Sequence, residues 1–149
     1  MFEGDYRFYF AMVAIVAGAA SYFTITGLEK DKYKKSKKPS WYPPGYAFSI
    51  AWSLIYLLYV YSWTQASKYP SINTIFALNI ILNFLWTFFF FYLENWPLAL
   101  FTLIALCLLL VSQISGLYKY SKLGSILLIP YLGWAVFATY LNYTMIDLN

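Results

Sequence analysis

SWYPPGYAFSIAW, residues 40 to 52, follows a run of lysines and opens a long apolar stretch with two prolines, a glycine, two tyrosines and two tryptophans. Proline fits the first turn of a helix, where the backbone N–H that it lacks has no partner. Tryptophan and tyrosine are enriched where a membrane meets water. The segment therefore predicts that a polar loop ends here and a membrane-spanning helix begins, with Pro43 and Pro44 in its first turn.

The composition of the whole chain indicates a membrane protein. Of its 149 residues, 62% are hydrophobic and 11% are charged, and the mean hydropathy is +0.60. A soluble domain of this length needs far more polar surface. The net charge of +4 suits orientation in a membrane and contact with anionic headgroups. Nucleic-acid binding is not indicated, because no basic helix face exists outside one short loop.

Five apolar stretches are long enough to cross a bilayer, for which a helix needs about 20 residues. The sequence therefore predicts an all-α integral membrane protein, a bundle of five transmembrane helices that forms a single domain over residues 1–149. Pro130 lies inside the fifth stretch, where we expect it to kink the helix and free a backbone carbonyl that neighbouring helices satisfy. The predicted spans are residues 6–28, 43–65, 71–92, 97–117 and 123–146.

The charges between the spans predict the orientation. Glu3 and Asp5 precede the first span, and the loop of residues 29–42 carries six lysines, against four basic residues on the other face of the membrane. Because positively charged loops stay in the cytoplasm, we expect the N-terminus outside and the C-terminus in the cytoplasm. We expect no cleavable signal peptide, because acidic residues stand where one carries basic residues. A bacterial plasma membrane is the expected location, and the mitochondrial outer membrane is the alternative.

Aromatic side chains share one face of the second span. Gly45, Phe48, Trp52 and Tyr56 recur there at helical spacing. The N–H of Trp52 and the O–H of Tyr56 need partners at this depth, so both side chains should face the bundle. Two interpretations remain open: a packed aromatic core, or the wall of a ligand pocket.

Polar side chains occur on one face of the third span. Asn79, Asn83, Trp86 and Phe90 follow one another at steps of four, three and four residues. An amide in hydrocarbon is costly unless it is hydrogen-bonded, so the two asparagines either hold helices together or bind an amphipathic molecule. The fifth span carries a comparable face, formed by Tyr131, Trp134, Ala138 and Leu141.

The first span contains pairs of small residues at a spacing of four. Ala14 pairs with Gly18, and Ala17 pairs with Ser21. Such pairs let helix backbones approach closely. They predict close packing either inside the protein or in a homodimer.

The residue types that the chain lacks exclude several kinds of chemistry. It has no histidine, and its one cysteine, Cys107, lies in an apolar span where we expect a packed small residue. The span cores carry no acidic or basic residue, which argues against proton relays and ordinary acid–base catalysis. We expect no metal and no cofactor. Aromatic walls with a few neutral hydrogen-bond donors suit a flat, apolar, partly polar ligand.

Four motifs stand in order along the chain: KPSWYPPGYAF (38–48), AW (51–52), LNFLW (82–86) and LLIPYLGWAVFATYLN (127–142). Together they resemble the translocator protein family, also called the tryptophan-rich sensory proteins or the TspO/MBR family. The resemblance covers all five spans. It implies a five-helix bundle, often a homodimer, that binds porphyrins such as protoporphyrin IX. Some members of that family also bind cholesterol and synthetic drug ligands. The implied pocket lies beneath the loop between the first two helices.

The resemblance also implies roles for single residues. Trp41, Pro43 and Pro44 match the motif that folds over the pocket. Trp52 and Trp134 match a tryptophan pair implicated in light-driven porphyrin breakdown. Further matches to the pocket are Asn83, Trp86, Ala138 and Leu141.

Two positions depart from the family pattern. Thr102 stands where several relatives have an acidic residue, which leaves ligand features that depend on that carboxylate in doubt. Tyr143 is not followed by the Lys or Arg of the family's sterol motif, so we expect no sterol binding at the C-terminus.

Three functions follow as hypotheses. The first is a membrane receptor or transporter that binds a porphyrin, whose propionates reach Lys37 or Lys38. The second is a photo-oxidative porphyrin-degrading enzyme, with Trp52 and Trp134 as candidate catalytic residues. The third is a structural membrane protein without a specific ligand. The predicted ligand-binding residues are Trp41, Pro43, Pro44, Gly45, Phe48, Trp52, Tyr56, Asn79, Asn83, Trp86, Phe90, Trp134, Ala138 and Leu141.

Overall fold

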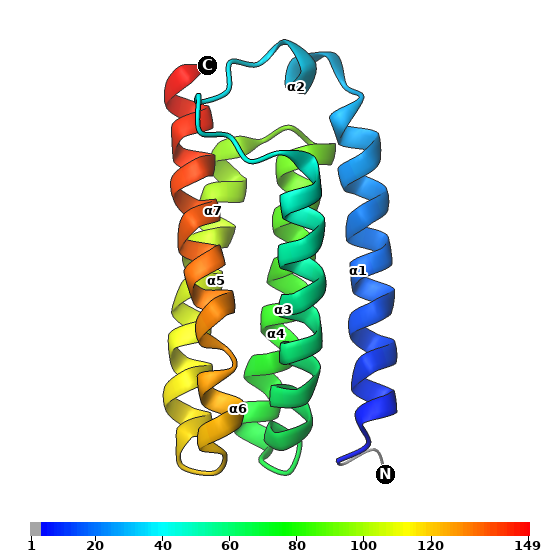
Figure 1. Ribbon diagram of the computed structural model, residues 1–149, viewed down its shortest axis with the longest axis vertical. Helices are drawn as coiled ribbons and strands as arrows, with labels where there is room; N and C mark the ends of the chain where they lie inside the picture. Colours follow the sequence, from blue (N-terminus) through cyan, green and yellow to red (C-terminus); the bar gives the residue numbers. More distant parts are fainter. Residues whose placement is uncertain (1–3) are drawn as a thin grey trace.

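The computed structural model describes residues 4–149, and over these residues it consists of helices joined by short connections (Figure 1). Five of the helical segments are long and apolar enough to cross a membrane. The prediction of an all-α bundle with five spans is therefore confirmed. The spans are α1 (Tyr6–Leu28), α3 (Gly45–Ala66), α4 (Pro70–Thr87) continued by the π-helix η1 (Phe88–Tyr92), α5 (Trp96–Tyr118), and α6 (Lys122–Ile126) followed by α7 (Ile129–Leu148).

The helices form a closed ring in the order α1, α3, α7, α5, α4. The most extensive packing joins α4 to α5 and α5 to α7, and α1 packs against both α3 and α4. The start of α1 lies at the opposite end of the bundle from the lysine-rich loop, and the C-terminus lies at the same end as that loop (Figure 1). The orientation in the membrane stays a prediction, and Glu3, on which it partly rests, lies outside the described residues.

The first turn of α3 begins later than predicted. Pro44 has an extended backbone (φ −64°, ψ 151°) and forms the N-cap, so the helix starts at Gly45 and both prolines precede it. Pro97, in contrast, does occupy the first turn of its helix, α5. There the Asn95 Oδ1 atom caps the helix by accepting a hydrogen bond from the Leu98 N–H at 3.1 Å.

Pro130 does not kink a continuous helix, as predicted, but follows a break. Helix α6 ends at Ile126 and α7 begins at Ile129, which places Pro130 in the first turn of α7. A helix interior loses about 3 kcal/mol to a proline, and restarting the helix avoids that loss. At this break Ser62 of α3 donates to the Gly124 carbonyl at 2.8 Å, which is not the Ile126 carbonyl that the missing N–H of Pro130 leaves free.

A continuous chain of side-chain hydrogen bonds crosses the interior. It links α3, α4, α5 and α7, and it uses both predicted asparagines. Each of the two amides bonds to side chains of other helices, which is the helix-linking role. From donor to acceptor, the bonds are Tyr56 to Asn83 (2.8 Å), Asn83 to Tyr131 (3.1 Å), Tyr131 to Asn79 (2.9 Å), Asn79 to Gln113 (2.9 Å), Gln113 to Tyr59 (3.1 Å) and Tyr59 to the Phe76 carbonyl (2.7 Å).

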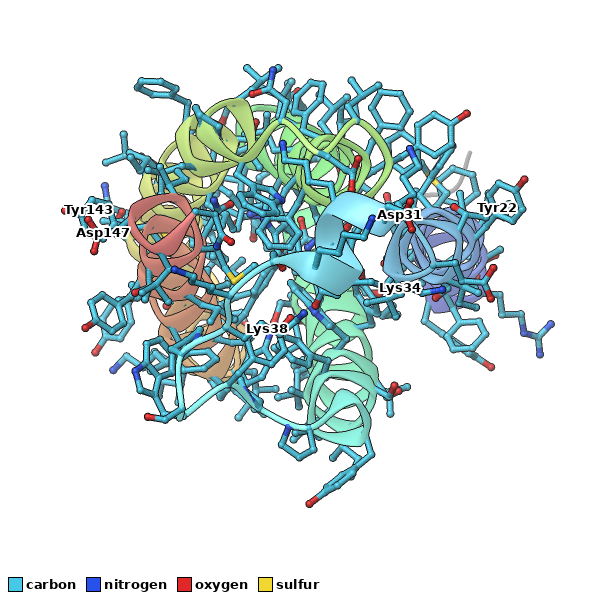
Figure 2. All side chains as sticks on the ribbon, turned by 90° about the horizontal axis from the view of Figure 1, so that it is seen from above. Tyr22, Asp31, Lys34, Lys38, Tyr143 and Asp147 are labelled. Carbon is cyan, nitrogen blue, oxygen red and sulfur yellow. The ribbon has the colours of Figure 1, made fainter. Side chains whose placement is uncertain are left out.

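The long loop between the first two spans contains a short helix, α2 (Asp31–Lys35), that the sequence analysis did not predict. The Nζ atoms of Lys30 and Lys32 donate to the carbonyls of Tyr92, the last residue of η1, and of Glu94, two residues beyond it. Cations are favourable at such a helix C-terminus. These bonds hold the loop across one end of the bundle, where Figure 2 shows α2 and Lys38 lying over the helices.

Candidate functional site

A cavity of about 400 Å³ lies between α1, α3, α4 and η1, beneath the lysine-rich loop. Small-molecule sites usually enclose about 300–1,000 Å³. Small and aliphatic side chains of α1 line one side, and aromatic side chains of α3, α4 and η1 line the other. The aromatic residues are Phe48, Trp52, Tyr56, Trp86 and Phe91.

Trp52 is the centre of the aromatic wall. Its ring lies 5.5 Å from the Tyr56 ring with an interplanar angle of 27°, and 5.8 Å from the Trp86 ring with an angle of 38°. Three aromatic faces in adjacent positions, tilted only modestly against one another, form a surface on which a flat ring system can stack. Trp86 is almost fully buried, so this wall is firmly packed.

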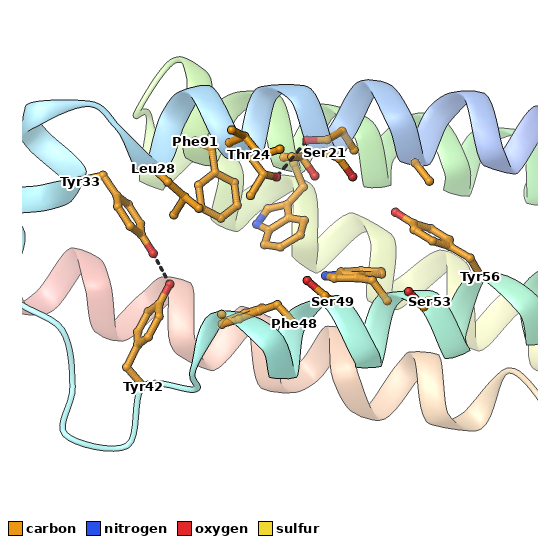
Figure 3. A pocket seen from close by; sticks show the side chains of 17 residues that line it. Ser21, Thr24, Leu28, Tyr33, Tyr42, Phe48, Ser49, Ser53, Tyr56 and Phe91 are labelled. Atoms are coloured by element: carbon orange, nitrogen blue, oxygen red, sulfur yellow. Dashed lines mark hydrogen bonds between the residues drawn. The ribbon is translucent and has the colours of Figure 1, made fainter.

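Two tyrosines form the roof of the cavity. The hydroxyl groups of Tyr33 and Tyr42 hydrogen-bond to each other across the end of the cavity (Figure 3). Burial raises the pKa of both phenols above the ordinary value, so both are neutral at physiological pH. Lys38 lies beside this roof, with its Nζ atom 3.0 Å from the Tyr33 carbonyl oxygen and 4.4 Å from the centre of the Tyr33 ring.

The cavity opens through the flank of the bundle, between α1 and α3. Ser21 of α1 and Ser49 and Ser53 of α3 line the cavity and are exposed. Figure 3 shows Ser49 and Ser53 on α3, facing α1 and Ser21 across the cavity. Because these positions lie within the spans, the opening faces the apolar part of a bilayer.

Five of the predicted ligand-binding residues line this cavity, and the others do not. Gly45, Phe48, Trp52, Tyr56 and Trp86 are part of its wall. Their role in ligand binding stays a prediction. The residues outside the lining are Trp41, Pro43, Pro44, Asn79, Asn83, Phe90, Trp134, Ala138 and Leu141.

Trp41 does not fold over the cavity mouth, where the resemblance put it. Its ring stacks on Tyr140 of α7, with centroids 5.3 Å apart and an interplanar angle of 12°, and it remains 41% exposed. The loop between α1 and α3 crosses the end of the bundle to α7 before it returns to α3. Trp41 therefore lies on the outer face of α7. The neighbouring Tyr42 reaches the cavity instead.

Trp134 lies directly behind the aromatic wall. Its ring is 5.6 Å from Phe48 and 6.5 Å from Trp52, both in edge-to-face contacts. Trp52 and Trp134, the two tryptophans that the family resemblance pairs, are therefore neighbours, although only Trp52 lines the cavity. Ala138 and Leu141, farther along α7, are buried in the bundle.

Phe91 lines the cavity in place of the predicted Phe90. The prediction assumed 3.6 residues per turn along the whole third span. The wider π turn of η1, marked by the bond from the Leu93 N–H to the Phe88 carbonyl at 2.9 Å, shifts the facing position by one residue. Phe90 packs against Trp86 and Trp96 on another side of the helix.

Several lining residues were not predicted. Ser49 and Ser53 are spaced by four residues, next to the aromatic face of α3, and that spacing of polar residues in an apolar span was the available signal. Tyr33 and Tyr42 carried no signal, because the path of the loop was unknown. The residues that the sequence analysis did not name as ligand-binding are Ala17, Ala20, Ser21, Thr24, Ile25, Leu28, Tyr33, Tyr42, Ser49, Ser53, Thr87 and Phe91.

The remaining candidates lie away from the cavity. Thr102 is buried in α5 and donates to the Leu98 carbonyl of its own helix at 2.9 Å. Cys107 is partly buried against the core, 3.7 Å from the Thr139 hydroxyl. Within residues 4–149, no three His, Cys, Asp or Glu side chains are grouped to hold a metal ion. Ala14 and Gly18 are exposed on α1, and a homodimer through them stays a prediction.

Comparison with known proteins extends along almost the whole chain. The family model described as the TspO/MBR family matches residues 9–148. The tryptophan-rich protein TspO of Archaeoglobus fulgidus is 38% identical over 92% of each chain. The translocator protein of Sus scrofa is 28% identical over 90% of this chain and 84% of its own. The tryptophan-rich sensory protein of Cereibacter sphaeroides is 28% identical over 78% of this chain and 76% of its own.

Proposed function

Because this chain belongs to the TspO/MBR family and is an integral membrane protein with several spans, we propose that it binds a porphyrin such as protoporphyrin IX, as a receptor or transporter does. The observation that carries the proposal is the aromatic wall of Trp52, Tyr56 and Trp86, beside a cavity of about 400 Å³. A porphyrin ring presents a flat apolar face that matches such a wall.

The charges near the cavity suggest how the ligand lies. Lys38 stands at the roof and offers a cation to a propionate at the loop end of the site. The chain contains no histidine, the usual protein ligand of haem iron. Binding therefore depends on the ring and its side groups and does not require iron.

The first prediction concerns affinity in the dark. Protoporphyrin IX, titrated into purified protein in detergent, is expected to quench tryptophan fluorescence with saturation. Trp52→Phe is expected to weaken binding about fivefold, because an aromatic contact of this kind contributes roughly 1 kcal/mol. Trp134→Phe should have a smaller effect, since Trp134 contacts the wall only from behind.

Trp96→Phe is the matched control for this titration. Trp96 is buried at the start of α5, its indole N–H has no partner, and it does not line the cavity. The affinity of the Trp96→Phe variant for protoporphyrin IX should equal that of the wild type. Quenching that rises linearly and equally in all variants would mean that porphyrin merely partitions into the micelle, and the structural role without a ligand would then be favoured.

A second function, photo-oxidative porphyrin breakdown, is favoured by the contacts among three indoles. Trp52 lies 5.8 Å from Trp86 and 6.5 Å from Trp134. An indole beside a photoexcited porphyrin can transfer one electron to it, which leaves an indole radical cation and a porphyrin radical anion, and dissolved dioxygen is the oxidant for the breakdown that follows. Illumination of the complex is expected to bleach the porphyrin absorbance faster than in protein-free micelles, and Trp52→Phe should remove the difference. Equal bleaching rates in the wild type, the variant and the protein-free micelles would exclude protein-catalysed breakdown and leave porphyrin binding as the proposed function.

A further inference from the structure

In the helix interiors of residues 4–149, three serine hydroxyls are unpaired, unlike the other Ser and Thr hydroxyls there. Ser71 also makes no hydrogen bond, but it stands in the first turn of α4, where no preceding turn offers a carbonyl. Within apolar helices these hydroxyls ordinarily donate to a carbonyl of the preceding turn. Thr24 donates to such a carbonyl at 2.9 Å. Ser62 and Thr64, farther along α3, do the same, and so do the threonines and serines of α5 and α7. Among the described residues, Ser21, Ser49 and Ser53 have no hydrogen bond, although each lies within a helix.

All three unpaired hydroxyls lie along the same cavity. Ser49 and Ser53 stand one turn apart on either side of Trp52 in the sequence, and Ser21 faces them from α1 (Figure 3). They border the open flank between α1 and α3. Unsatisfied polar groups are costly at membrane depth, so this arrangement needs a partner that the helices themselves do not provide.

A second, independent group, beside the cavity, also lacks a partner. Trp86 is 6% exposed, and its Nε1–H has no acceptor. Tyr56 has the opposite character: its hydroxyl proton is committed to Asn83 at 2.8 Å, so its oxygen faces the cavity as an acceptor. The three serine hydroxyls thus offer unused donors to acceptor groups of a ligand, and their oxygens remain able to accept as well.

Resting on the proposed function, we infer that Ser21, Ser49 and Ser53 form a subsite for neutral acceptor groups, ester or protonated carboxyl, on the edge of a flat ligand that enters from the bilayer. The neutral state follows from the charges present: apart from Arg7 at its outer end, the three helices around the cavity carry no cation. An ionised carboxylate without a cation is strongly disfavoured at this depth. Ionised groups belong instead at the roof, beside Lys38.

The test compares two metal-free porphyrins with the same aromatic core. Protoporphyrin IX dimethyl ester carries two ester groups, whereas etioporphyrin carries only alkyl groups. In Ser21→Ala/Ser49→Ala/Ser53→Ala, the affinity for the dimethyl ester is expected to fall about tenfold through lost hydrogen bonds, while that for etioporphyrin stays within about twofold. Alanine is the best helix former, so the helices should persist.

Ser112→Ala/Ser115→Ala is the matched control. Both serines are exposed on α5 and donate to carbonyls of their own helix, away from the cavity. This variant should bind both porphyrins like the wild type. If the triple variant loses the wild-type melting temperature, the three single Ser→Ala variants replace it, each with an expected loss of about twofold for the ester.

The outcomes separate the two proposals. If the wild type binds neither porphyrin with saturation, the proposed function fails. If it binds both and the serine variants lower neither affinity, or lower both equally, the subsite is refuted while porphyrin binding stands. A loss confined to the dimethyl ester supports the subsite.

Discussion

Asn79→Leu is expected to lower the free energy of unfolding by about 2–4 kcal/mol, because it interrupts the interior hydrogen-bond chain in its middle. Asn79 is fully buried, accepts from the Tyr131 hydroxyl at 2.9 Å and donates to Gln113 Oε1 at 2.9 Å. Leucine has nearly the same size and leaves no cavity. The loss therefore comes from two buried polar groups left without a partner, each in a region without water.

Reversible unfolding in mixed micelles, followed by circular dichroism, measures this loss. Tyr56→Phe is the graded comparison, since Tyr56 is the terminal donor and its loss leaves only Asn83 Oδ1 unpaired. We expect about 1 kcal/mol for that variant. Equal stability of Asn79→Leu and wild type would show that the chain does not hold the helices together. Affinity for porphyrin should be unchanged in Asn79→Leu, because Asn79 does not line the cavity.

The sequence predicted the elements whose cause is local. Hydropathy sets the five spans. A 3.6-residue period predicted that Trp52, Tyr56 and Trp86 face the interior, and the Trp52 ring does lie 5.5 Å from the Tyr56 ring and 5.8 Å from the Trp86 ring. The inward direction of Asn79 and Asn83 was likewise predictable, because the cost of a bare amide in lipid leaves few alternatives.

The structure departs from the sequence-based expectations where contacts between distant residues decide the position of a side chain. Trp41 was placed over the cavity, yet the path of its loop depends on lysine contacts with the end of η1, some sixty residues away in the sequence. Phe90 was predicted from a regular helical period, because no local signal in the sequence indicated the π turn. The unpaired serines could be found only by comparing the hydrogen bonds of all Ser and Thr residues, which requires the structure.

Gly27→Ala is expected to destabilise the protein by about 3 kcal/mol or more and to weaken ligand binding at the same time. A Cβ atom at Gly27 would lie 2.4 Å from the Phe91 carbonyl oxygen and 2.5 Å from the Phe91 Cβ. These atoms belong to the backbone and its first side-chain carbon, so no rotamer change relieves the contact. Helix α1 must move away from η1.

Gly18→Ala is the matched control on the same helix. A Cβ atom there meets nothing within 4 Å, so the change should be neutral or slightly stabilising through better helix propensity. Melting temperature and porphyrin affinity are measured for both variants. Wild-type values for Gly27→Ala would contradict the close packing of α1 on η1.

The effect on binding follows from the neighbours of Gly27. Leu28 and Phe91 line the cavity from α1 and η1, on either side of this contact. Moving α1 outward separates them and also widens the flank on which Ser21 faces Ser49 and Ser53. The ligand would then lose contact with one wall while the aromatic wall of Trp52 and Trp86 stays in place. Gly27→Ala should therefore weaken binding of etioporphyrin as well as of the dimethyl ester, in contrast to the serine variants.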